Sequence, residues 1–166
     1  MFTIKHMKIQ KSFLSKEELC AIQREISHCE NTRAAAIEAL KIVQRKRGWI
    51  SDNIIGSIAQ ALNVTQCDLE EIATFYNQIF RKPVGQHIIR FCDSVVCYIM
   101  GYHKIKMILE KILKINIGET SDDGKFTLLP TCCLGKCDQS PVMMIDDETY
   151  VKLTPESIFY ILEKYQ

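Results

Sequence analysis

The sequence has no apolar stretch of the ~18 residues that a membrane-spanning helix requires. Its first segment, MFTIKHMKIQKSF, lacks the apolar core of a signal peptide, and it contains none of the arginine typical of a mitochondrial presequence. Charge of one sign is not in excess, because 21 basic residues face 20 acidic ones. We therefore expect a cytosolic chain that is drawn neither to nucleic acid nor directly to an anionic membrane.

Several patterns of catalytic and binding sites are absent as well. There is no glycine-rich loop such as GxGxxG or GxxxxGK, so the chain is not expected to bind a nucleotide alone. The absence of CxxC argues against a thiol–disulfide oxidoreductase. His87 and His103 are not at ligand spacing with any cysteine, and no serine–histidine–acid pattern stands out. We expect no catalytic residue in this chain.

Cysteine, by contrast, is plentiful, with eight residues in a chain of 166. In a reducing cytosol these thiols should serve as metal ligands or core thiols rather than disulfides. Cys20, Cys29 and Cys67 have no partner at ligand spacing, and we expect them to be buried and inert. The share of hydrophobic residues, 47%, is enough for one domain or two small ones.

The N-terminal part of the chain, residues 1–85, predicts a helical bundle. Apolar residues recur at helical spacing in four segments, and each segment starts at a residue typical of a helix N-cap. Two starts also have the spacing of a capping box. The expected starts are Ser15, Asn31 with Thr32, Ser51 and Thr65. The aromatics of the last segment are expected to pack inside, with a docking surface for another subunit as the alternative; they are Phe75, Tyr76 and Phe80.

The pattern changes at RKPVGQ, residues 81–86, which holds the first proline, and we place a domain boundary there. Residues 86–166 predict the strand HIIRFC, the amphipathic helix YIMGYHKIKMILEKILKI, the strands KFTLLPTC, VMMI and TYVKL, and a final helix. Thr154 should cap that helix, with Pro155 at its first position. This order predicts an α+β module in which helices flank a small mixed sheet.

Two cysteine pairs fall in the loops after two of these strands. They are CDSVVC, from Cys92 to Cys97, and CLGKC, from Cys133 to Cys137. Four thiolates brought together suit either a tetrahedral zinc ion or a cluster of two irons and two sulfides. Zinc sites mostly have two residues within each pair, whereas these pairs have four and three, and the wider spacing favours the cluster. Gly135 is suited to close backbone approach to such a cluster.

Cys132 leaves an ambiguity, because its spacing to Cys137 equals that of Cys92 to Cys97. Side chains alternate along a strand, so only one of Cys132 and Cys133 should reach the metal. The spacing alone does not decide which. Three functions remain open from the residues: an electron carrier, a zinc-stabilised interaction module, and a free-standing ferredoxin-like protein.

Four segments, IEALKIVQRKRGWI, IATFYNQIF, CDSVVC and LPTCCLGKCDQSP, closely resemble the E-subunit family of bacterial NADH-quinone oxidoreductase, respiratory complex I. The likeness runs from about residue 13 to the C-terminus. It implies a helical N-terminal part followed by a thioredoxin-like ferredoxin domain that holds one 2Fe-2S cluster. The family's four ligands fall on Cys92, Cys97, Cys133 and Cys137, and this would leave Cys132 as a neighbour that does not bind.

The resemblance also implies a place in a larger enzyme. The chain would be a subunit of a proton-translocating oxidoreductase, beside the flavin-bearing F subunit and other subunits of the peripheral arm. Its cluster would exchange one electron with the flavin, and FMN and NADH would be bound only by the partner. The expected location is the cytoplasmic face of the inner membrane, with membrane contact only through the complex.

Overall fold

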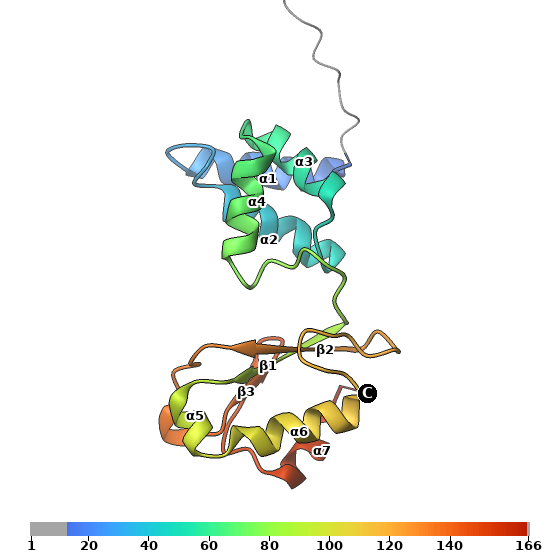
Figure 1. Ribbon diagram of the computed structural model, residues 1–166. Coiled ribbons are helices and arrows are strands. Elements are labelled where there is room, and N and C mark those ends of the chain that lie inside the picture. The colour runs from blue at the N-terminus through green and yellow to red at the C-terminus, as the bar shows by residue number, and fades with distance from the viewer. Residues whose placement is uncertain (1–12, 166) are drawn as a thin grey trace, which may run out of the picture. The chain divides into compact units, whose positions relative to one another are not determined.

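The computed structural model describes residues 13–165. The chain divides into two compact units, Met1–Pro83 and Val84–Gln166 (Figure 1). Each unit has its own hydrophobic core. Among the described residues, none of the helices has the length and apolar character needed to cross a bilayer. In the part of the chain that is described, the first unit has only helices as regular structure, whereas the second combines helices with a sheet.

Residues 13–83 of the first unit form four helices: α1 (Lys16–His28), α2 (Ala36–Arg47), α3 (Asp52–Leu62) and α4 (Gln66–Phe75). The predicted capping box at α1 is confirmed, because Ser15 Oγ accepts from the Glu18 N–H at 3.2 Å and the Glu18 carboxylate accepts from the Ser15 N–H at 2.7 Å. At α4, Thr65 Oγ1 likewise accepts from the Asp68 N–H at 3.1 Å. These bonds satisfy backbone donors that have no partner within the helix.

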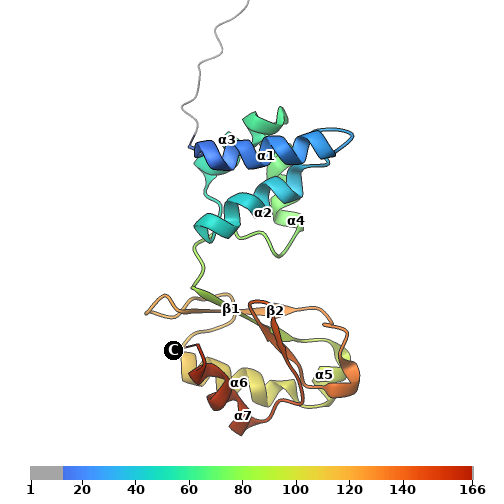
Figure 2. The ribbon, with the colours of Figure 1, turned by 180° about the vertical axis from the view of Figure 1, so that it is seen from behind.

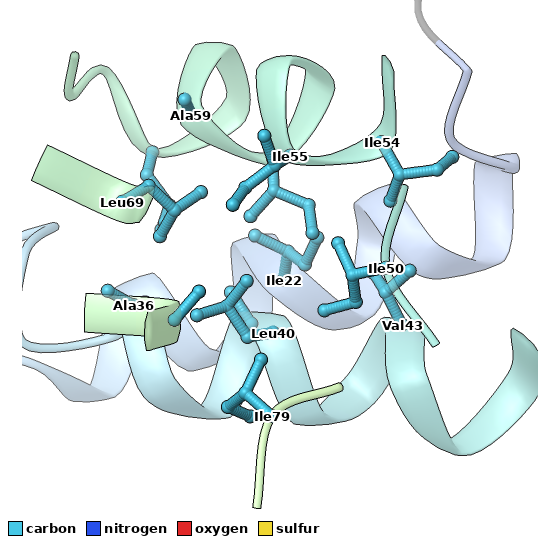
Figure 3. Packing of buried hydrophobic residues seen from close by; sticks show 14 of the residues in the cluster. Ile22, Ala36, Leu40, Val43, Ile50, Ile54, Ile55, Ala59, Leu69 and Ile79 are labelled. Atoms are coloured by element: carbon cyan, nitrogen blue, oxygen red, sulfur yellow. The ribbon is translucent and has the colours of Figure 1, made fainter. Parts of the chain in front are cut away.

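The core of this unit lies between the four helices (Figure 3). Most of its apolar residues come from the helix faces that the 3.6-residue period places inward, and Leu14, Ala35, Ile50 and Ile79 join them from outside the helices. Fully buried members include Ile22 of α1, Leu40 of α2, Ile55 of α3 and Leu69 of α4. Burial of each such side chain contributes about 1.5 to 3 kcal/mol. The helical bundle predicted for the N-terminal part is therefore present.

Some details of the bundle differ from expectation. Helix α2 begins at Ala36 rather than at Asn31, because the Asn31 side chain accepts from the Ala34 N–H at 2.9 Å and closes a turn before the helix. Cys20 and Cys67, which were expected to be buried, are exposed, and Cys29 is half-buried. Cys20 lies two residues from buried Ile22, about 200° around the helix, and so points away from the core.

The two aromatics at the end of α4 also differ from expectation. Phe75 is 80% exposed and Tyr76 is 42% exposed, so the prediction that both pack inside was wrong. Phe75 is two positions beyond buried Ala73 and therefore lies on the opposite side of the helix. Tyr76 is the C-cap residue of α4, and its backbone is extended rather than helical.

The second unit contains β1 (His87–Cys92), α5 (Val95–Ile99), α6 (Tyr102–Leu113), β2 (Phe126–Thr131), the 3-10 turn η1 (Cys137–Gln139), β3 (Met143–Ile145), β4 (Glu148–Tyr150) and α7 (Pro155–Glu163). The sheet order is β2-β1-β3-β4. Strands β1 and β2 are parallel, while the other two pairs are antiparallel. The mixed sheet confirms the α+β prediction.

Helices α6 and α7 cover the same face of this sheet (Figures 1 and 2). Ile105 and Leu109 of α6 and Ile158 of α7 pack against Ile89 and Phe91 of the central strand β1. Thr154 caps α7 by a capping box, and Pro155 is its first residue, as predicted. The long helix expected after β1 is instead two helices, α5 and α6, because the chain turns at Met100 and Gly101.

Candidate metal centre

Strands β1 and β2 end side by side, and this places both cysteine segments at one edge of the sheet. In the parallel register Cys92 is opposite Thr131, and the Asp93 N–H donates to the Thr131 carbonyl at 3.1 Å. The carboxyl ends of parallel strands are where α/β sheets commonly bind ligands. The convergence expected from the sequence is thus set by the β1–β2 pairing.

The first cysteine pair is buried. Both residues were expected in a loop, but Cys92 is the last residue of β1 and Cys97 lies on α5. Each is only 2% exposed. Both thiols pack against Val142, with Leu134 partly buried beside them. The apolar neighbours keep water from this side of the site.

The second pair is exposed to solvent. Cys133 follows β2 and Cys137 begins η1, and their sulfurs are 3.3 Å apart. The two pairs thus differ in environment, although they lie at the same sheet edge. One pair is formed by a strand end and a short helix, and the other is formed by a loop.

Contacts between the segments bring the pairs toward each other. The Leu134 N–H, from the second segment, donates to the Cys92 sulfur in the first. Cys137 interacts electrostatically with Cys97 and Cys92 as well as with Cys133. Within residues 13–165, no three histidine, cysteine, aspartate or glutamate side chains are grouped closely enough to hold a metal ion. Cys92 and Cys97 form a buried, inner pair, and Cys133 and Cys137 form an exposed, outer pair.

Burial and hydrogen bonds act in opposite directions on the thiol pKa values of the buried pair. Burial alone would raise the pKa of Cys92, but N–H donors from Ser94 and Leu134, together with Cys97 and the Ser94 hydroxyl, lower it overall. Burial raises the pKa of Cys97, whose thiol donates to Ser140 Oγ at 3.4 Å. In the outer pair, the hydrogen bond with Cys133 raises the pKa of Cys137.

Gly135 adopts a backbone conformation that favours glycine. Its φ is +75°, in the left-handed region that favours glycine, and a side chain there would meet nothing within 4 Å. This conformation directs the Gly135 N–H to the Cys133 sulfur at 3.4 Å. The backbone conformation alone therefore favours glycine here, and the close approach to a cluster stays a prediction.

Cys132 and Cys133 are not distinguished by strand alternation, because β2 ends at Thr131 and both residues lie beyond it. Both are exposed. The sulfur that contacts Cys137 is that of Cys133. His87 lies at the start of β1, where its Nδ1 is 2.7 Å from Asp146 Oδ2, and it belongs to neither pair.

Sequence reasoning missed two serines of this site. Ser94 contacts the Cys92 sulfur by its N–H and its hydroxyl, and Ser140 contacts the Cys97 sulfur by its hydroxyl. Each serine follows a cysteine of one pair within three residues, and this proximity is the one signal in the sequence that pointed to them.

The donor set fits a two-iron cluster. Such clusters are held by four cysteine thiolates, and a pairwise arrangement supplies two sulfurs to each iron. N–H donors directed at the sulfurs, from Ser94, Leu134 and Gly135, are the interactions that stabilise thiolates and tune such centres. Fold and site together define a small α+β module that carries two cysteine pairs at one sheet edge.

Comparison with known proteins identifies the family. The thioredoxin-like [2Fe-2S] ferredoxin family matches residues 22–166. The E subunit of NADH-quinone oxidoreductase from Escherichia coli (strain K12) is 58% identical over 153 residues, which cover 92% of each chain. The Buchnera aphidicola (subsp. Acyrthosiphon pisum) protein of that name is 57% identical and covers 92% of this chain and 94% of its own. The chain therefore belongs to the thioredoxin-like [2Fe-2S] ferredoxins and, among them, to the E-subunit family of NADH-quinone oxidoreductase.

A solved structure with a similar fold is an NAD+-reducing [NiFe]-hydrogenase in the H2-reduced state. It superposes with a TM-score of 0.66 at 24% identity and covers 76% of this chain. This chain spans only 22% of the hydrogenase chain. The similarity is one of fold.

Proposed function

We propose that this chain is the electron-transferring E subunit of a proton-translocating NADH-quinone oxidoreductase, and that Cys92, Cys97, Cys133 and Cys137 bind its one 2Fe-2S cluster. The observation that carries the proposal is the pairing of these thiols at the edge formed by β1 and β2, in a chain 58% identical to an E subunit of that enzyme. When bound, such a cluster accepts and releases one electron at a time.

The residues of the chain have separate tasks in this proposal. The four cysteines bind as thiolates, since metal binding requires loss of the thiol protons. Val142 and Leu134 exclude water from the inner pair. N–H groups of Leu134 and Gly135 donate to sulfur and offset its negative charge.

The proposed electron partner is the flavin of the F subunit. FMN and NADH would be bound by that partner and not by this chain, in keeping with the missing phosphate-binding loop. The chain would work with other peripheral-arm subunits at the cytoplasmic face of the inner membrane. Exposed Cys133 and Cys137 lie on the side from which a partner could approach.

Metal and sulfide analysis tests the cluster. The full chain is purified without oxygen, and iron, zinc and acid-labile sulfide are measured. We expect about two irons and two sulfides per chain. One zinc per chain without sulfide would contradict the proposal and support a zinc-stabilised module instead.

Co-purification tests the partner. A tagged chain is isolated from its own cells, and the preparation is examined for a flavoprotein and for reduction of the cluster by NADH. We expect both. A loaded cluster in a preparation that retains no flavoprotein and does not respond to NADH would support a free-standing ferredoxin-like protein.

A further inference from the structure

Ser140 is a buried hydroxyl between the two cysteine pairs. It is only 8% exposed. Its Oγ lies 3.4 Å from the sulfur of Cys97 and donates to the Cys137 carbonyl at 2.9 Å. One side chain thus contacts the inner pair through a sulfur and the outer pair through the backbone.

The hydrogens around Ser140 can be counted. The hydroxyl has one hydrogen, which goes to the Cys137 carbonyl, while the Cys97 thiol donates its own hydrogen to Ser140 Oγ. When Cys97 binds a metal it gives up that proton, and its sulfur becomes an acceptor only. The Ser140 hydroxyl then has two acceptors within reach, and the charged sulfur is the stronger one.

We propose that the Ser140 hydroxyl donates to the Cys97 sulfur in the cluster-bound protein and thereby raises the reduction potential of the cluster. An added electron increases the negative charge on the sulfurs, so a hydrogen bond to sulfur stabilises the reduced form more than the oxidised form. Ser140 is therefore a positioning and tuning residue. The inference rests on the proposed function, because it requires a cluster at these cysteines.

Ser140 is suited to an experimental test. The N–H donors to sulfur belong to the backbone and survive any ordinary substitution, whereas the Ser140 donor is a side chain. Its removal takes away the contacts of one hydroxyl, with the Cys97 sulfur and the Cys137 carbonyl, and leaves all four cysteines in place. Burial also protects this bond from competition by water.

The test compares Ser140→Ala and Ser140→Thr in the full chain. The midpoint potential is measured by redox titration of the cluster followed by EPR, with iron and sulfide contents determined on each sample. We expect the midpoint potential of Ser140→Ala to be more negative than that of the wild type. At a fixed applied potential, the ratio of reduced to oxidised cluster should fall about tenfold, which corresponds to a shift of about 59 mV for one electron. Ser140→Thr keeps the hydroxyl and should restore the wild-type value.

Ser57→Ala is the matched control. Ser57 is 7% exposed, like Ser140, but lies in the helical unit, where its hydroxyl donates to the Asn53 carbonyl. Its loss should leave the potential unchanged. This control separates an effect on the cluster from a general effect of removing a buried hydroxyl.

Three results would overturn the inference. The first is an unchanged potential in a fully loaded Ser140→Ala protein. The second is an equal shift in Ser140→Thr. The third is failure of either variant to hold the cluster, which would make Ser140 a structural residue. A wild-type chain without acid-labile sulfide would instead refute the proposed function, so the two failures are distinguishable.

Discussion

Cys133 and Cys132 are adjacent in the sequence, but it is the sulfur of Cys133 that contacts Cys137, at 3.3 Å. We therefore expect Cys133→Ser to abolish or strongly change the visible and EPR spectra of the cluster. Cys132→Ser, the matched control, should leave both spectra recognisable. Loss of the cluster in Cys132→Ser with retention in Cys133→Ser would show that the ligand assignment is displaced by one residue.

At the scale of single residues, the environment of Glu18 predicts that the stability of the helical unit depends on pH in the acid range. Its carboxylate is 2% exposed, and the hydrogen bond with Arg47 lowers its pKa from 4.5 to about 2, against the opposing effect of burial. A lowered pKa in the folded state means that this stabilisation is complete above pH 4.5 and is lost as the pH falls toward 2. The free energy of unfolding should fall across that window.

Glu18→Gln tests this pair. We expect a loss of about 2 kcal/mol at neutral pH, because Arg47 loses its charged partner while it is itself only one-third exposed. Urea unfolding followed by circular dichroism measures the change. Glu17→Gln is the control, since Glu17 pairs with Lys46 but is 83% exposed, and an equal effect there would contradict the role of burial.

The spacing of residues was enough to predict the cysteine pairs, but not the hydrogen bonds around them. Cys92 and Cys97 are recognisable because thiols at such spacing are rare without a site. Ser140 is one serine among many in the sequence, and its role depends on burial beside Cys97, which only the fold creates.

At the scale of elements, the entry into β1 depends on Gly85. A Cβ at this position would lie 2.9 Å from backbone atoms of Lys125 and Phe126, which are not flexible. Gly85→Ala should therefore separate the start of β1 from β2 and cost about 1 to 3 kcal/mol of unfolding free energy. Thermal unfolding of the loaded chain measures it.

Gly56→Ala is the matched control for that prediction. Gly56 lies inside α3, and a Cβ there meets only the mobile end of the Gln66 side chain at 3.3 Å. Alanine favours a helix more than glycine does, so this variant should be neutral or slightly more stable. Equal destabilisation by both changes would show that the close approach at Gly85 is unimportant.

Elements with clear local signals were predicted well. Capping at Ser15, Thr65 and Thr154 depends on residues within one turn, and the sequence contains all of that information. The break between α5 and α6 and the late start of α2 were missed. The break and the late start both depend on whether the chain forms a turn or continues the helix, and the spacing of apolar residues does not distinguish these two outcomes.

At the scale of the whole molecule, each unit has a separate core. We expect a fragment that spans residues 84–166 to fold and to bind the cluster with a spectrum like that of the full chain, because all the proposed ligands and their hydrogen-bond donors lie within it. Circular dichroism and iron content provide the measurement. An unfolded fragment would show that the helical unit is needed for stability.

The unequal burial of the two cysteine pairs has a consequence for maturation and turnover of the protein. Cys133 and Cys137 face solvent, whereas Cys92 and Cys97 are each 2% exposed. A carrier that hands over a cluster, or a chelator that removes one, reaches the outer sulfurs first. We therefore expect ligand exchange to begin at the outer pair. A chelator too large to pass Leu134 and Val142 should detach iron from Cys133 and Cys137 first.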